Sequence, residues 1–190
     1  MIDDLGMLRR YLRFRCPDLS IVGLLRTFPA TILLTSIVVA CGTITWGQTR
    51  NEFKPTLDRL GFDYRLLTRG EFQRVITENF VQSTPGIHFS MVVMVATSLV
   101  LCELLAGSRN TVITFFVCHW AAAIGTILVL RLLSGFGMDR ASALLSIPDA
   151  GSSASVHGAY AVAAMMLPPR LATIAYGILL GITVVLLFQQ

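Results

Sequence analysis

The chain has 190 residues, of which 54% are hydrophobic and only 14% are charged, and its formal net charge is +4. Its mean hydropathy is +0.70. About a quarter of the residues in a soluble domain are charged, so this composition excludes an ordinary soluble domain and indicates a membrane protein. The four cysteines show no paired spacing, and no Cys-x-x-Cys or His-Glu-x-x-His motif occurs. We therefore expect no disulfide scaffold, no metal site and no cofactor.

The first 26 residues form a basic arm ahead of the first apolar stretch. The arm mixes basic residues with apolar residues at helical spacing, a pattern typical of a helix lying on the inner membrane surface; the basic residues include Arg9, Arg10, Arg13 and Arg15. The positive-inside rule then places the N-terminus in the cytoplasm. The remaining basic residues are scattered between apolar stretches, a pattern that favours anchoring at a membrane over binding of nucleic acid.

Residues 27–190 are expected to form one all-α polytopic helical bundle with at least five transmembrane helices, in the plasma membrane. Five stretches approach the roughly 20 residues that cross a bilayer, and they cover residues 27–47, 86–106, 111–133, 151–168 and 171–188. Among all the acidic and basic residues, only Glu103 and Arg131 fall within these stretches, close to their ends. We expect Glu103, which lies close to the start of the third span near the inner face, to form a pair or to cap a helix end, and Arg131 to reach the headgroups.

The loops between the stretches differ in length. The outer loop 48–85 has apolar residues at helical spacing over 53–60 and again over 72–80, which predicts two short amphipathic helices, with an ordinary solvated loop as the alternative. Residues 107–110 and 168–170 predict tight hairpins. Residues 134–150 predict a second outer loop.

The fourth stretch begins with an unusually polar sequence of small residues, from Asp149 to Gly158. Ser153 is expected at the start of this helix, where free backbone N–H groups and the helix dipole favour a developing negative charge. A nucleophile would have electrostatic support at that position. Gly151, Ser155 and Ala159 recur every four residues, which allows a neighbouring helix to pack closely.

Together these motifs resemble the rhomboid family of intramembrane serine proteases, over residues 70–188. Residues 151–154 look like the family's Gly-x-Ser-Gly sequence, with a further glycine five residues after the serine. Residues 69–77 resemble its Trp-Arg segment in the first loop, and the histidine and glutamate of its second helix and the Gly-Ser turn after them also have counterparts. The matching positions are Arg74, His88, Glu103, Gly107, Gly151, Ser153 and Gly158.

The resemblance implies an endopeptidase that cleaves single-span membrane proteins near the outer surface. Ser153 would attack the scissile carbonyl and His88 would help to stabilise the oxyanion, whereas the other five matching positions would be structural. In the family the catalytic base comes from a sixth transmembrane helix. The residues up to Gln190 supply five spans, so we expect this chain to lack that histidine.

Two departures from the family pattern support a second hypothesis. Val92 stands where the family has its oxyanion asparagine, and Ala154 replaces the glycine after the nucleophile. Since loss of one oxyanion donor lowers the rate by about 10²- to 10³-fold, whether the chain is an enzyme stays open. The alternative is a proteolytically inactive rhomboid-like protein that binds transmembrane clients or belongs to a membrane complex. Its expected partners are the lipid bilayer and single-span proteins.

The histidines and Ser153 also have structural interpretations. His157, four residues after Ser153, either contacts it as a base or fills the place of an aromatic ring. His119 is expected to pack against Trp120 or a hydroxyl of a neighbouring helix, too deep to reach Ser153. His88 could be an ordinary interfacial histidine, and Ser153 a small helix-packing residue.

Overall fold

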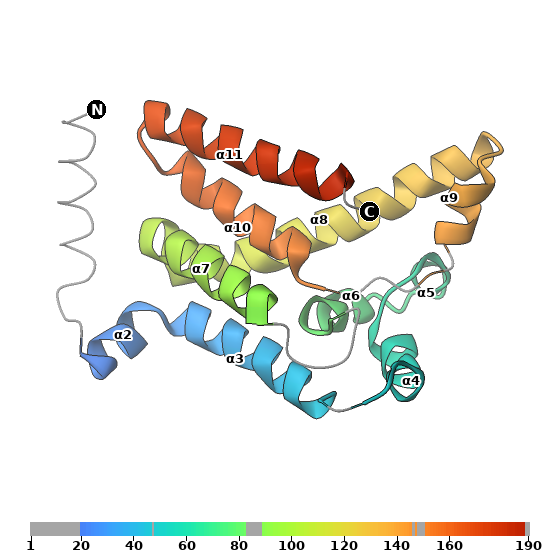
Figure 1. Cartoon of the computed structure of the whole chain (residues 1–190), viewed down its shortest axis with the longest axis horizontal. Helices are drawn as coiled ribbons and strands as arrows, with labels where there is room; N and C mark the ends of the chain where they lie inside the picture. The colour runs from blue at the N-terminus through green and yellow to red at the C-terminus, as the bar shows by residue number, and fades with distance from the viewer. Residues whose placement is uncertain (1–19, 47, 83–88, 146, 148–150, 189–190) are drawn as a thin grey trace.

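The computed structural model describes residues 20–46, 48–82, 89–145, 147 and 151–188, and every regular element in these segments is a helix (Figure 1). The all-α prediction is therefore confirmed. The elements are α2 (Ile21–Thr27), α3 (Pro29–Ile44), α4 (Arg50–Leu60), α5 (Tyr64–Thr68), α6 (Arg74–Thr77), the 3-10 turn η1 (Glu78–Phe80), α7 (Phe89–Ala106), α8 (Ser108–Gly135), α9 (Asp139–Leu144), α10 (Ser153–Met165) and α11 (Pro169–Phe188).

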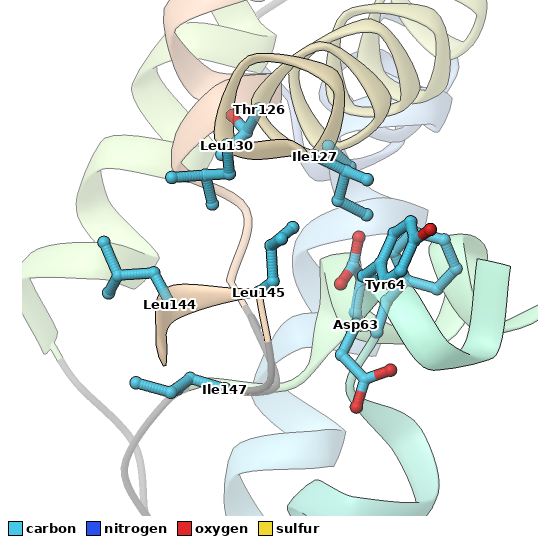
Figure 2. A pocket seen from close by; sticks show the side chains of 11 residues that line it. Asp63, Tyr64, Thr126, Ile127, Leu130, Leu144, Leu145 and Ile147 are labelled. Atoms are coloured by element: carbon cyan, nitrogen blue, oxygen red, sulfur yellow. The ribbon is translucent and has the colours of Figure 1, made fainter. Parts of the chain in front are cut away.

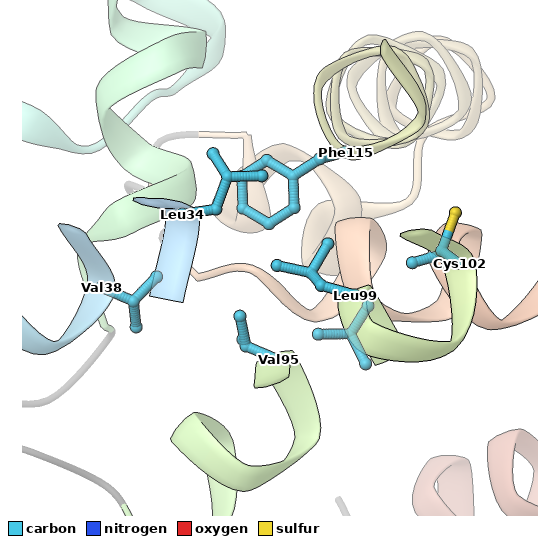
Figure 3. Close-up of a cluster of buried hydrophobic side chains, with 8 residues drawn as sticks. Leu34, Val38, Val95, Leu99, Cys102 and Phe115 are labelled. Carbon is cyan, nitrogen blue, oxygen red and sulfur yellow. The ribbon is translucent and has the colours of Figure 1, made fainter. Parts of the chain in front are cut away.

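Helices α7 and α10 form the centre of the bundle. Helix α3 packs on α7, α8 packs on both α7 and α10, and α11 lies along α10 (Figure 1). The core between them is apolar and includes one small residue, Ala159, which lets α10 approach its neighbours closely. The buried residues of this core are Leu34, Val38, Val95, Leu99, Cys102, Phe115, Val156 and Ala159 (Figure 3).

A single residue, Gly107, separates α7 from α8. Its φ of 86° lies in the left-handed region, which glycine adopts without the steric penalty of a Cβ atom. The Thr111 hydroxyl donates to the Gly107 carbonyl at 3.0 Å, within the first turn of α8. The hairpin predicted at 107–110 is thus present but shorter, because Ser108–Asn110 already belong to α8.

Two helices in the described segments, α7 and α8, are long and apolar enough to cross a membrane. Only 28% of the apolar window of α7 and 17% of that of α8 is buried inside the chain, so both present broad apolar faces to their surroundings. Helix α3 is apolar but has only 16 residues. The count of at least five spans therefore stays a prediction.

The loop 48–85 contains more helix than expected. Helix α4 ends at Leu60, as the periodicity predicted, and α6 with η1 covers 74–80 within the second predicted segment. Helix α5 was not predicted. The loop 134–150 also contains an unexpected helix, α9, which packs on α8 through a 2.6 Å hydrogen bond between the hydroxyls of Ser134 and Ser142.

Candidate functional site at the start of α10

The start of α10 is held in place by the loop 48–85. Gly151 donates its backbone N–H to the carbonyl of Glu78 at 3.0 Å, and its φ of 132° is a conformation that favours glycine. Ser152 is the N-cap residue, and its side chain forms no capping hydrogen bond. The first turn of α10 is thus anchored through the main chain and lacks a side-chain cap.

The neighbouring serines 152 and 153 face different environments. Ser153, the first residue of α10, is exposed, whereas Ser152 is completely buried. A hydroxyl at the first helical turn lies close to N–H groups that no helical carbonyl can reach. Ser153 therefore combines solvent access with the electrostatic environment that we expected for a nucleophile.

His157 contacts the main chain of Ser153. Its Nδ1 lies 2.8 Å from the Ser153 carbonyl oxygen. A carbonyl can only accept, so Nδ1 carries the proton and the neutral ring has its acceptor at Nε2. The ring is thus tied to its own helix one turn after Ser153, through the backbone of that serine.

Of the two other positions of the expected oxyanion site, His88 and Val92, the structure describes only Val92. His88 lies outside the described residues, so its predicted role stays a prediction. Val92 is half-buried in α7.

A buried hydrogen-bonded pair that sequence reasoning missed lies near the start of α10. His119 on α8 and Glu78 on η1 are joined by a 2.9 Å contact between Nε2 and Oε1, and their side chains are only 6% and 1% exposed. The expectation that His119 packs against Trp120 or a hydroxyl was wrong, since its partner is a carboxylate and Trp120 is 40% exposed. A buried histidine needs a polar partner, and Glu78 of the loop 48–85 is that partner.

A second buried contact adjoins this pair. The Ser155 hydroxyl lies 2.9 Å from Asn79 Oδ1 and 2.6 Å from the carbonyl oxygen of Phe115. The four-residue spacing of small residues on α10 placed Ser155 on a packed face. That spacing could not predict the contact with Asn79, which lies 76 positions earlier in the chain.

Two of the positions that matched the rhomboid pattern make contacts typical of structural residues. Arg74 donates from Nη1 to the Asp58 carbonyl at 2.7 Å, and its Nε lies 2.7 Å from a carboxylate oxygen of Glu71. Gly158 lies against Cys118, so closely that an added Cβ would overlap that side chain. These contacts join α4 to α6 and α10 to α8.

Glu103 is buried near the end of α7. Its two carboxylate oxygens accept the backbone N–H groups of Ala30 and Thr31, at 3.0 and 2.7 Å. It therefore caps a helix, which was one of its two expected roles, and that helix is α3.

The bundle contains two hollows. A cavity of about 400 Å³ lies between the 62–64 segment, α8 and α9, and Glu78 forms part of its wall (Figure 2). An apolar groove of about 430 Å³ lies between α7, α10 and α11. Its lining residues are Met94, Leu101, Leu105, Tyr160, Ala163, Ala164, Leu167, Ala175, Ile178 and Leu179.

No group of three His, Cys, Asp or Glu side chains that could hold a metal ion occurs in the part of the chain that the structure describes. The chain matches no protein-family model, no curated protein and no solved structure. The resemblance to rhomboids therefore depends on the motifs alone.

Proposed function

We propose that this chain is a rhomboid-like integral membrane protein that binds single transmembrane segments of other proteins. The observation that carries the proposal is the apolar groove between α7, α10 and α11, whose lining is almost entirely hydrocarbon. Inside a bilayer, helices associate through close van der Waals packing. A groove lined by three alanines beside longer apolar side chains offers that packing to an incoming helix.

The proposed bundle comprises α3, α7, α8, α10 and α11, with the N-terminus in the cytoplasm. At 1.5 Å per residue, the 28 residues of α8 extend about 42 Å, whereas the 13 residues of α10 extend about 20 Å. The hydrocarbon layer is about 30 Å thick. Helix α8 is thus long enough to project beyond it, and α10 short enough to begin within it, so that polar groups gather at the start of α10.

Photocrosslinking to a defined reporter tests client binding. A benzophenone amino acid is placed at Ile178, which lines the groove and is 58% exposed, or at Leu128 on α8, which is outside the groove and 61% exposed. Each variant is coexpressed with a tagged single-span protein that carries a 20-residue apolar helix. We expect crosslinks to form at Ile178 and to stay at background at Leu128.

A matched pair of substitutions on α11 shows whether the groove itself is responsible. Ala175 lines the groove, and Ala172, three residues earlier, does not; both are half-buried. Ala175→Trp should reduce the Ile178 crosslink to the background of the Leu128 position, and Ala172→Trp should leave it unchanged. Equal crosslinking at Ile178 and Leu128 in the parent chain would refute client binding in this groove.

A second function, intramembrane serine endopeptidase, is favoured by one observation: Ser153 is exposed at a helix start that no side chain caps. The same reporter tests it, because cleavage gives two tagged fragments. Ser153→Ala should abolish both cleavage and labelling by a fluorophosphonate, and Ser90→Ala, at an exposed serine in the first turn of α7, should not. If the reporter stays intact but still crosslinks, and if the parent chain and Ser153→Ala are labelled equally, the endopeptidase function is refuted and client binding remains.

A further inference from the structure

Three buried polar atoms near the start of α10 have no hydrogen-bond partner among the described residues. They are Asn79 Nδ2 on η1, His119 Nδ1 on α8 and Ser152 Oγ at the N-cap of α10. Asn79 and Ser152 are 0% exposed and His119 is 5% exposed. Buried polar groups in native proteins are nearly always satisfied, by protein atoms or by ordered water, so three unsatisfied atoms in one region need a common explanation.

Hydrogen bonds bring the three elements that carry these atoms to one junction. The Ser155 hydroxyl connects α10 to Asn79 and to the Phe115 carbonyl of α8, and Ser152 precedes Ser155 by three residues, on the same face of the helix. His119 follows Phe115 by four residues, also on one face. Glu78 connects α8 to the start of α10, because its carboxylate binds His119 and its main-chain carbonyl accepts the N–H of Gly151.

We propose that a single internal water molecule binds at this junction, between η1, α8 and α10, and bridges Asn79, His119 and Ser152. A buried water typically forms about three hydrogen bonds to groups that would otherwise lack partners. The number and the location of the unsatisfied atoms both match that requirement.

The chemistry of the three atoms also selects water over an ion. The Glu78 carboxylate can only accept, so the His119 ring donates from Nε2. Its Nδ1 then accepts a water proton in the neutral ring or donates to the water oxygen in the protonated ring. The Ser152 hydroxyl can donate to the water oxygen. Asn79 presents Nδ2 as a donor, or Oδ1 as an acceptor if its amide is turned over, and water satisfies either orientation because it has two protons and two lone pairs.

The sign of a stability change tests the proposal. If the Ser152 hydroxyl is simply unsatisfied, its removal in Ser152→Ala relieves a buried polar group and should leave the melting temperature unchanged or raise it. If it binds water, Ser152→Ala loses a buried hydrogen bond and should melt about 2–4 °C lower in a chain of this size. The Ser152 side chain makes no capping bond, so loss of a helix cap does not contribute.

The matched control is Ser153→Ala, the same change at the exposed neighbour, which should melt within about 1 °C of the parent chain. A melting temperature of Ser152→Ala equal to or above that of Ser153→Ala overturns the proposal. The full-length protein in lipid nanodiscs is used for both.

A measurement on the unaltered chain removes any dependence on how a variant folds. Hydroxyl radicals generated by X-ray radiolysis oxidise side chains that lie beside bound water, including buried ones. We expect oxidation at His119, and much less at Phe115 and Leu99, which are equally buried but whose side chains lie together in the apolar core. Oxidation of His119 no higher than that of Phe115 contradicts the presence of the water.

Discussion

Glu103 provides the sharpest stability prediction, because it satisfies the start of a helix 73 positions away in sequence. The first turn of a helix has N–H groups that no helical carbonyl reaches. At the start of α3, the Phe28 N–H donates to the Leu24 carbonyl and Pro29 has no N–H. The remaining two, from Ala30 and Thr31, both donate to Glu103.

The size of the effect follows from these two bonds. A hydrogen bond to a charged group contributes about 1.5–3 kcal/mol, and Glu103 is only 2% exposed, so water cannot readily replace its carboxylate. Glu103→Ala should therefore destabilise the protein by about 3–6 kcal/mol. Glu103→Gln keeps one accepting oxygen but turns an amide NH₂ toward the other N–H. Its loss should be smaller than that of Ala but still measurable.

Thermal unfolding in detergent micelles and amide hydrogen exchange together check this prediction. The expected order of melting temperatures is parent chain, then Glu103→Gln, then Glu103→Ala, and in both variants the Ala30 and Thr31 amides should exchange faster than in the parent. Glu71→Gln is the control, because that carboxylate pairs with Arg74 at the surface and should contribute at most about 1 kcal/mol. If Glu103→Gln melts with the parent chain, the capping role of Glu103 is refuted.

Two further predictions concern α4 and the contact between α8 and α10. The Thr49 backbone N–H and hydroxyl donate to Glu52 and hold its carboxyl pKa below the usual value. The resulting stabilisation of α4 is full above the unfolded pKa of about 4.3 and is lost as the pH falls through the lower folded pKa. The amide hydrogens of α4 should therefore exchange faster at low pH. In Thr49→Ala this dependence of exchange on pH should be smaller. Gly158→Ala should destabilise the chain by about 1–3 kcal/mol through overlap with Cys118. Adding Cys118→Gly to that variant should restore most of the lost melting temperature. If it restores none, the overlap with Cys118 is not the cause of the destabilisation.

The sequence predicts those features that depend on a residue's own segment. The end of α4 before Gly61 and the hairpin at Gly107 follow from local periodicity and from glycine's conformational freedom. The Glu78–His119 pair could not be predicted in this way, because its members lie 41 positions apart and each segment's pattern specifies only which face is buried. Nothing in the α8 sequence indicates that the partner of His119 is an acidic residue of the loop 48–85.

Burial divides the polar residues at the start of α10 into two groups that should behave independently. Consecutive residues of a helix point about 100° apart, so Ser153 faces outward while Ser152 faces the interior together with Ser155. Chemistry on an external molecule can therefore involve Ser153 and the neighbouring His157, whereas His119, Glu78 and Ser152 are confined to internal contacts. Ser153→Ala should change labelling without changing the melting temperature, and Ser152→Ala should do the reverse. If either variant altered both properties, the serines would share one site, and the distinction between an external and an internal group would fail.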